Sequence, residues 1–330
     1  MAIGPEGSHL SRMTLTTIDD LRAAQERIRG KVHRTGQGSS EYLSRTSGAR
    51  VSPKLELFQK TGSFKVRGVI NTLAQLTPDE RARGVVSMSA GNHAQALAWG
   101  ATQLGIAATI VMPATAMASK VEATRGYGGT VVQTADDLLA TARGIMEREG
   151  RTLIHPFDDP RVIAGQGTVG LEILEDVPDV DVVLVGCGGG GLLSGVAAAV
   201  KLLRPTARVI GIEPEGSAVM TLSLAAGSPQ RLQVNKTIAD GLAPPFTGAN
   251  AFAHVRAFVD EVITVSESQI LDGMRALMER CKLFVEPSAG AAVVPLLAAH
   301  PLVPRGARVV PIVCGGNIDL AKVSMLFATS

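Results

Sequence analysis

Short runs of β-branched residues alternate with longer helix-like stretches along most of this 330-residue chain, and no other feature constrains the fold as strongly. Strand-like runs lie at 84–89, 107–112, 130–133, 181–186, 208–213, 261–265 and 307–313. Helical patterns lie between or beside them, at 92–104, 118–127, 136–150, 161–174, 192–203, 267–282 and 287–300. Such alternation predicts an α/β fold whose sheets are mostly parallel.

The composition excludes several classes of protein. Hydrophobic residues make up 45% of the chain, which is too many for a disordered protein. Basic and acidic residues nearly balance, at 32 and 30, so we expect neither nucleic acid nor a membrane as a partner. The cysteines are too few for a disulfide framework, and the first residues lack the apolar core of a signal peptide. Both features favour a cytoplasmic location.

A run of glycines separates the strand-like run 181–186 from the helical pattern 192–203. Consecutive glycines leave their N–H groups bare, and the helix that follows directs its positive end to the same point. This arrangement predicts a phosphate site, and the alternative is a tight turn without a ligand. The residues are Gly188, Gly189, Gly190 and Gly191.

The same stretch also fits the dinucleotide-binding pattern G-x-G-x-x-G, through Gly186, Gly188 and Gly191. Glu213, at the end of the next strand-like run, stands where an acid would bind a ribose. Taken alone, this pattern would indicate an NAD enzyme. It lies in mid-chain, however, and the features below require a different cofactor.

Lys65 lies between Phe64 and Val66 in a stretch of small and apolar residues. A lysine amine that is removed from water has a lowered pKa and becomes nucleophilic toward an aldehyde. The alternative is a surface lysine at the start of a helix.

Two further polar groups follow strand-like runs. The loop 89–95 places Asn92 and His93 at a helix N-terminus, which suits a carboxylate, although Asn92 alone is also a good N-cap and His93 a good packing residue. Cys314 directly follows the run 307–313, at the edge where α/β sheets bind ligands. The alternative for Cys314 is a buried structural cysteine.

In this order, these features resemble the fold-type II pyridoxal-phosphate enzymes, and more narrowly their threonine/serine dehydratase branch, which includes serine racemase. The resemblance is to the short catabolic type without a regulatory domain. The matching stretches are KLELFQKTGSFKVRG (54–68), SAGNHAQALAWGA (89–101), GCGGGGLLSG (186–195), EPSAGAA (286–292) and CGGNIDL (314–320).

The resemblance implies a fold like that of the tryptophan synthase β chain, with two domains that each contain a mostly parallel twisted sheet flanked by helices. Residues 1–75 and 156–330 would form a large cofactor-binding domain. Residues 76–155 would form a small mobile domain that carries the asparagine loop and closes on the substrate. A homodimer or homotetramer is also implied.

The resemblance assigns cofactor roles to individual residues. Lys65 would hold pyridoxal phosphate as a Schiff base and later take the substrate's α-proton. Phe64 would flank the cofactor ring, and Asn92 would bond its hydroxyl group. The phosphate would bind the N–H groups of Gly188, Gly189, Gly190, Gly191 and Leu192.

Other residues would complete the site. Cys314 would face the pyridine nitrogen, Glu286 would lie near the cofactor, and Gly241 would lie at its edge. Lys54, Glu56 and Arg67 would be framework charges that pair close by. The loop that receives the substrate carboxylate would consist of Ser89, Ala90, Gly91, Asn92 and His93.

The implied reaction is the elimination of water from L-threonine or L-serine, which gives 2-oxobutanoate or pyruvate and ammonia. Alternatives are a related lyase for another β-substituted amino acid, such as 3-hydroxyaspartate or a diamino acid, and a serine racemase. A third alternative is a non-catalytic binding or regulatory protein that has kept the cofactor pocket. Such a protein would have little use for Lys65 as a Schiff-base lysine.

Two departures from the family pattern refine this expectation. Ala90 stands where serine racemases have a serine that acts as acid and base, so we expect racemisation to be slow. Val219 stands six residues after Glu213, where metal-activated relatives have a second acid, so no divalent metal site is expected.

Overall fold

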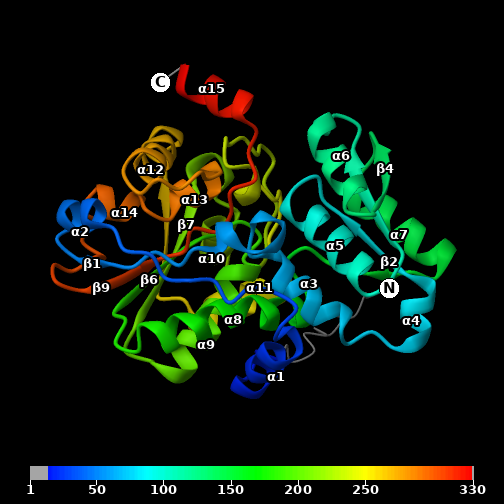
Figure 1. The fold of residues 1–330 in the computed structure, drawn as a ribbon, viewed down its shortest axis with the longest axis horizontal. Helices are drawn as coiled ribbons and strands as arrows, with labels where there is room; N and C mark the ends of the chain where they lie inside the picture. The colour runs from blue at the N-terminus through cyan, green and yellow to red at the C-terminus, as the bar shows by residue number, and fades with distance from the viewer. Residues whose placement is uncertain (1–13, 329–330) are drawn as a thin grey trace, which may run out of the picture.

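The computed structural model describes residues 14–328, whose strands form two separate parallel sheets (Figure 1). The larger sheet has the order β1-β9-β6-β7-β8, and the smaller has the order β4-β3-β2-β5. The larger contains β1 (Arg50–Val51), β6 (Val182–Gly186), β7 (Arg208–Pro214), β8 (Glu261–Val265) and β9 (Arg308–Pro311). The smaller contains β2 (Val85–Met88), β3 (Ala108–Pro113), β4 (Thr130–Thr134) and β5 (Thr152–Leu153). The predicted α/β class is confirmed.

Helices supply the crossover connections that parallel strands require. They are α1 (Ile18–Ile28), α2 (Glu41–Ser47), α3 (Lys65–Leu73), α4 (Pro78–Arg83), α5 (Asn92–Gln103), α6 (Ala118–Gly126), α7 (Leu138–Glu149), α8 (Pro160–Asp176), α9 (Gly191–Leu203), α10 (Val219–Ala226), α11 (Ala249–Phe258), α12 (Glu267–Glu279), α13 (Pro287–Ala291), α14 (Val294–Leu297) and α15 (Leu320–Ala328). Short 3-10 turns are η1 (Glu56–Phe58), η2 (Lys60–Gly62), η3 (Glu215–Ser217) and η4 (Asp240–Leu242).

The smaller sheet is covered by helices on both faces, because successive residues of its strands pack into two different cores. Val85 and Ile110 lie in the core that α5 covers, whereas the adjacent Val86 and Val111 lie in the core that α7 covers. Successive strand residues point to opposite faces, so both faces must be apolar. In the larger sheet, α9 and α13 both pack against β6 and β7.

All seven predicted strands are present, but one predicted helix is divided. The stretch 287–300 forms two short helices, α13 and α14, instead of one. Pro295 explains the break, because proline lacks the N–H that a continuous helix would need at this position and is tolerated in a helix's first turn. The two-residue strands β1 and β5 carry too little pattern to be predicted.

Helix α3, which begins at Lys65, lies between the two sheets and packs on both sides (Figure 1). On one side it contacts α8 so closely that a Cβ on Gly165 would lie 2.5 Å from the Cα of Gly68. On the other side it contacts α5, because apolar residues recur with helical spacing. Those residues are Val66, Val69, Ile70 and Leu73.

Buried charges fix α3 to the larger-sheet side. The Arg67 guanidinium bonds Glu56 at 2.8 Å and Glu172 at 2.7 Å, and Lys54 Nζ lies 2.7 Å from Glu172. Burial opposes ionisation of Glu56, but it is outweighed by the charge and hydrogen bonds of Arg67 together with the Thr35 hydroxyl and the charge of Lys54, so the pKa of that carboxyl is lowered. The prediction that Lys54, Glu56 and Arg67 are paired framework charges is confirmed, and Glu172, which was not predicted, is the partner of Lys54 and a second partner of Arg67.

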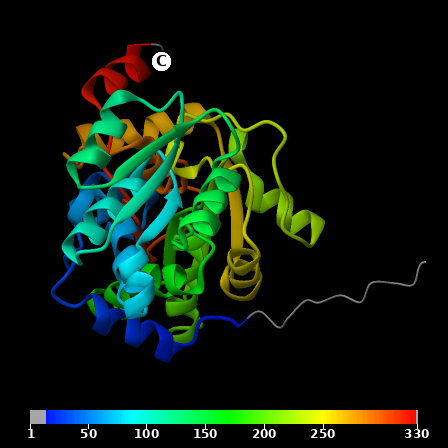
Figure 2. The same cartoon turned by 90° about the vertical axis from the view of Figure 1, so that its right-hand side faces the viewer.

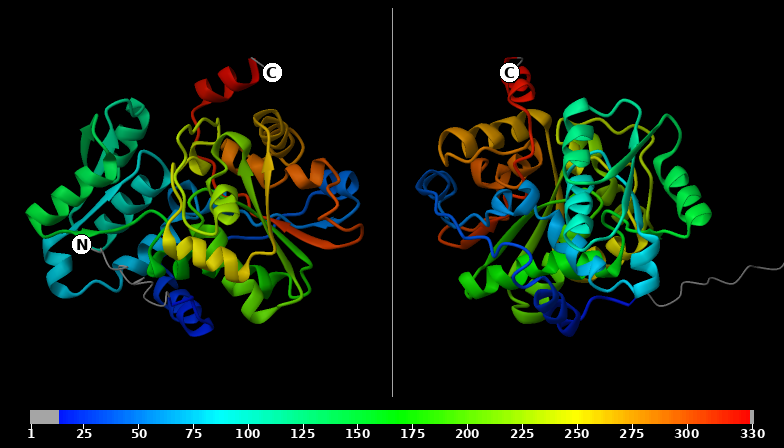
Figure 3. Two further views of the ribbon diagram at one scale, coloured as in Figure 1. Left: turned by 180° about the vertical axis from the view of Figure 1, so that it is seen from behind. Right: turned by 45° about the vertical axis from the view of Figure 1, so that its right-hand side comes forward.

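In Figure 2 the body built on the smaller sheet lies in front of the body built on the larger sheet, and Figure 3 shows the two bodies side by side. All strands of the smaller sheet come from residues 85–153, whereas α3 shares the core of that body although it precedes residue 76. The boundary between a large and a small domain therefore stays a prediction. Within residues 14–328, no helix is long and apolar enough to cross a membrane. The N-terminal segment considered for a signal peptide lies outside the described residues.

Candidate active site

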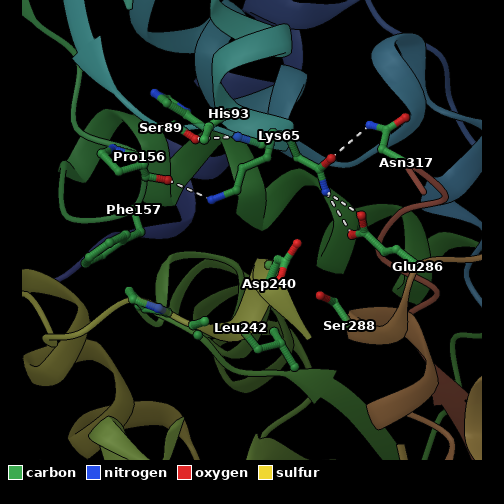
Figure 4. A pocket seen from close by; sticks show the side chains of 18 of the residues that line it. Lys65, Ser89, His93, Pro156, Phe157, Asp240, Leu242, Glu286, Ser288 and Asn317 are labelled. Atoms are coloured by element: carbon green, nitrogen blue, oxygen red, sulfur yellow. Dashed lines mark hydrogen bonds between the residues drawn. The ribbon is translucent and has the colours of Figure 1, made fainter. Parts of the chain in front are cut away.

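A cavity of about 750 Å³ lies between the two bodies, where the carboxyl ends of strands from both sheets meet (Figure 4). The loops after β2 and β6 and the segment after β9 all contribute to its wall. Its size is typical of sites for small molecules. Every residue predicted from the sequence for the site lines this cavity: Phe64, Lys65, Ser89, Ala90, Gly91, Asn92, His93, Gly188, Gly189, Gly190, Gly191, Leu192, Gly241, Glu286 and Cys314.

Lys65 extends into the cavity from the first residue of α3. Its amine donates a hydrogen bond to the main-chain carbonyl of Pro156, at 2.9 Å, and lies 5.2 Å from the centre of the Phe64 ring. Burial lowers the pKa of the Lys65 amine to about 8. At pH 7 about a tenth of this amine is therefore neutral, far more than for a lysine in water. The alternative of a surface lysine is wrong, because Lys65 lines the cavity.

The glycine loop has the features of a phosphate cradle. Helix α9 begins at Gly191, and its N-cap residue, Gly190, has φ +90° and no side chain to bond the free N–H groups. A Cβ on Gly189 would lie 2.4 Å from the Phe157 ring, so a side chain does not fit there. Bare N–H groups at a helix N-terminus bind anions such as phosphate.

Asn92 connects the two bodies at the floor of the cavity. Asn317 Nδ2 donates to the Thr61 carbonyl at 2.7 Å and to Asn92 Oδ1 at 2.8 Å. Because a carbonyl can only accept, these bonds orient both amides, and Asn92 Nδ2 donates to Glu286 at 2.8 Å. The N-cap of α5 is Gly91, so the interpretation of Asn92 as a capping residue is wrong.

Glu286 is an unusual carboxyl group. Burial raises its pKa to about 7, although the bond from Asn92 favours the charged form. A group with this pKa exchanges a proton near neutral pH.

The loop that precedes α5 combines an open helix N-terminus with a buried histidine. No side chain caps α5, while the Gly91 N–H donates to Ser89 Oγ at 3.2 Å. The His93 ring is 2% exposed, and its Nε2 lies 3.0 Å from Ser87 Oγ. Burial, with the charges of Lys65 and His155, lowers the pKa of His93 well below its usual value, so the ring is neutral.

Two buried polar side chains, Ser288 and Cys314, line the part of the cavity where a cofactor ring would bind. The Ser288 hydroxyl points into the cavity in Figure 4 and has no hydrogen-bond partner among the described residues. A Cβ on Gly241 would lie 2.6 Å from that hydroxyl, so a side chain at position 241 would collide with Ser288. Burial raises the pKa of the Cys314 thiol well above its usual value, so the thiol is neutral.

Together, the lysine, the phosphate cradle and the unpartnered hydroxyl fit pyridoxal phosphate. The dinucleotide alternative does not fit, because Glu213 is fully buried and its carboxylate accepts N–H bonds from Met220 and Thr221, at 2.7 and 2.8 Å. It therefore stabilises the first turn of α10 and is not available to a ribose. Within residues 14–328, no group of three or more His, Cys, Asp or Glu side chains is placed to hold a metal.

The sequence model of the pyridoxal-phosphate dependent enzyme family matches residues 31–315. The chain belongs to this family. It is 42% identical to the catabolic L-threonine dehydratase of Escherichia coli strain K12, over 96% of this chain and 98% of that protein. It is also 42% identical to the L-threonine ammonia-lyase of Thermotoga maritima, over 94% of this chain and 78% of that protein.

Solved structures give the same result for the fold. The maize serine racemase structure superposes with a TM-score of 0.89 and 38% identity, over 96% of this chain and 98% of that one. The predicted fold type, family and pyridoxal-phosphate dependence are therefore confirmed.

Several residues of this pyridoxal-phosphate site were not predicted from the sequence. Asn317 and Ser288 stand inside the motifs CGGNIDL and EPSAGAA, so the motifs were a sufficient signal for both. Pro156 and Phe157 belong to none of the five matching stretches. Their contribution depends on the fold, which brings the end of β5 next to Lys65 and Gly189.

Proposed function

We propose that this protein is a pyridoxal-phosphate dependent ammonia-lyase that converts L-threonine to 2-oxobutanoate and ammonia, and L-serine to pyruvate and ammonia. The observation that carries the proposal is the Lys65 amine, which has a lowered pKa and faces a cavity with an uncapped phosphate cradle. Its relatives named threonine dehydratase and threonine ammonia-lyase favour threonine as the substrate.

In this proposal, different residues bind the phosphate, bind the substrate carboxylate and accept the proton. When bound, pyridoxal phosphate supplies an electron sink for the α-carbon of the amino acid. The glycine loop and α9 hold the phosphate group. The loop 89–93 and the open N-terminus of α5 hold the substrate carboxylate. With the cofactor bound, the Lys65 amine would be the group that accepts the α-proton.

The hydroxyl group lost from the β-carbon and one proton, equal in number to the α-proton removed, leave as water, and one water molecule is consumed when the enamine product hydrolyses. The overall change is therefore threonine to 2-oxobutanoate plus ammonia, without an external oxidant. We assign Asn92 to the ring hydroxyl of the cofactor, Cys314 to its pyridine nitrogen, and Phe64 and Gly241 to its flanks. Glu286 supports Asn92.

A serine racemase is the second candidate, because the maize enzyme has the same fold. Racemisation needs a second acid on the ring face opposite the lysine. Ala90 lines the cavity at the position proposed for that acid and cannot donate a proton. We therefore propose that elimination dominates.

The test is to purify the protein with pyridoxal phosphate, record its absorbance spectrum, and add L-threonine, L-serine and L-threo-3-hydroxyaspartate separately while detecting 2-oxo acids. An absorbance band of lysine-linked cofactor and release of 2-oxobutanoate would support the proposal. A band with turnover of 3-hydroxyaspartate alone would assign the site to that substrate. The absence of a band after addition of cofactor would contradict the proposal.

We also propose that the protein is cytoplasmic and forms a homodimer or homotetramer, as the family resemblance implies. Sedimentation of the holoenzyme at several concentrations tests the assembly, and a monomer at all of them would contradict it.

A further inference from the structure

Helix α6 of the smaller-sheet body is tied to the opposite side of the cavity by two side-chain contacts. Lys120 Nζ lies 2.9 Å from Asp240 Oδ2, and Ser119 Oγ donates to Asp319 Oδ2 at 2.9 Å. Asp240 begins the turn that contains Gly241, and Asp319 follows the CGGN segment. Both contacts therefore join the smaller-sheet body directly to the larger-sheet body at the wall of the cavity.

Asp240 is shared by two cations. Besides Lys120, it accepts a bond from Lys322 Nζ of α15, at 2.8 Å. Burial opposes ionisation of Asp240, but the bonds from Lys322 and Lys120 outweigh it and lower the pKa of the carboxyl. The carboxylate is therefore charged at neutral pH and available to both ammonium groups.

The position of α6 sets the position of the loop proposed to bind the substrate carboxylate. Helix α6 packs against α5, and α5 begins directly after residues 89–91. Ala90 and Ala116, which precede α5 and α6, pack against the same core. A movement of α6 away from Asp240 would carry that loop away from Lys65 and open the cavity.

We propose that Lys120 is a positioning residue that holds the loop 89–93 over the cavity through its ion pair with Asp240. The proposal deepens the proposed function, on which it rests, because it concerns how the same site retains its substrate. Lys120 acts through the smaller-sheet body and takes no part in proton transfer. Lys322 has a different role, because its bond to Asp240 does not involve that body.

The expected effect is moderate, because the ion pair is partly exposed, with 26% of the Lys120 side chain and 52% of the Asp240 side chain accessible. Loss of the pair shifts the balance between closed and open forms. If the open and closed forms are comparably populated before the substrate binds, and the closed form dominates once it is bound, this shift raises KM while leaving kcat nearly constant.

The experiment compares the holoenzyme with its Lys120→Met, Lys120→Arg and Lys322→Met variants. Lys322→Met is the matched control, because it removes the same charge from the same carboxylate but leaves the contact between the bodies. We expect Lys120→Met to raise KM for L-threonine about three- to fivefold with kcat within about twofold. Lys120→Arg should restore KM, and Lys322→Met should leave it within about twofold of the original.

A second readout does not depend on turnover. Amide hydrogen exchange of residues 118–126 should be faster in Lys120→Met than in Lys322→Met, because exchange reports local opening. Raising the ionic strength with choline chloride, at a fixed concentration of alkali cations, should raise KM of the unmodified enzyme and barely change that of Lys120→Met.

Unchanged KM and unchanged exchange in Lys120→Met would overturn the proposal. Equal effects of Lys120→Met and Lys322→Met would also overturn it, because they would assign the effect to the charge of Asp240 and not to the contact between the bodies. If no amino acid is turned over, the proposed function fails, and the exchange rates still decide whether Lys120 holds α6 in place.

Discussion

The Lys65 amine lies 2.9 Å from the carbonyl oxygen of Pro156, to which it donates a hydrogen bond. This contact joins the helix that carries the reactive lysine to the segment that follows the smaller sheet. The carbonyl holds the amine inside the cavity, next to the glycine loop, before any aldehyde arrives. Burial lowers its pKa to about 8, so uptake of the cofactor should depend on pH in a defined way.

The rate at which the apoenzyme forms lysine-linked cofactor should rise with pH and level off above about pH 8. Only the neutral amine attacks the aldehyde, and below its pKa the neutral fraction falls about tenfold per pH unit. Stopped-flow absorbance after mixing with pyridoxal phosphate measures this rate. Lys65→Ala should give no lysine-linked band, and a midpoint near the ordinary lysine pKa would show that the amine is not desolvated.

Gly189→Ala should weaken cofactor binding at least tenfold, because its Cβ would lie 2.4 Å from the Phe157 ring and would displace the phosphate cradle. Equilibrium dialysis of the apoenzyme against pyridoxal phosphate measures the affinity. Gly144→Ala is the control, since Gly144 lies within α7 with nothing within 4 Å of the added carbon. Equal affinities in the two variants would mean that the loop does not bind the phosphate.

Arg67→Met should lower the free energy of unfolding by about 3–5 kcal/mol, because it leaves buried carboxylates without their partner. The residues involved are Glu56 and Glu172. Arg45→Met should change it by less than about 1 kcal/mol, since its pair with Glu41 is 3.9 Å long and exposed. Urea unfolding of both apoproteins gives the comparison, and a small effect of Arg67→Met would argue that the network is dispensable.

Ala90→Ser should increase the ratio of D-serine to pyruvate formed from L-serine at least tenfold, because a general acid typically contributes about 100-fold or more. Chiral chromatography and 2-oxo acid detection in the same reaction give the ratio, so a partial loss of folded enzyme cancels. An unchanged ratio would place the missing acid elsewhere on the cavity wall.

Patterns that depend on neighbours in the chain were sufficient to predict much of this molecule. The seven strands, the α/β class and the glycine loop follow from short-range periodicity and from residues whose backbone chemistry is distinctive. The ordered motifs were needed to relate Lys65 to Asn92, because neither residue is distinctive when taken alone. The break between α13 and α14 follows from Pro295, although the apolar residues of 287–300 continue across it and favour a single helix.

Contacts between distant segments could not be predicted in the same way. Nothing in the sequence near Pro156 indicates that its carbonyl will face Lys65, because the contact exists only after both bodies have folded. The Lys120 to Asp240 pair has the same character, since charged residues of this kind are common on surfaces and their partners depend on the packing of whole bodies.

The way α3 fills the space between the sheets limits how the gene could be divided. A fragment that contains only residues 76–155 would lack the side chains of Val66, Val69, Ile70 and Leu73, which complete the core beneath α5. Its exposed apolar surface would favour aggregation over independent folding. Transplantation of the smaller body into another protein would therefore need to carry α3, and with it Lys65, as part of the same unit.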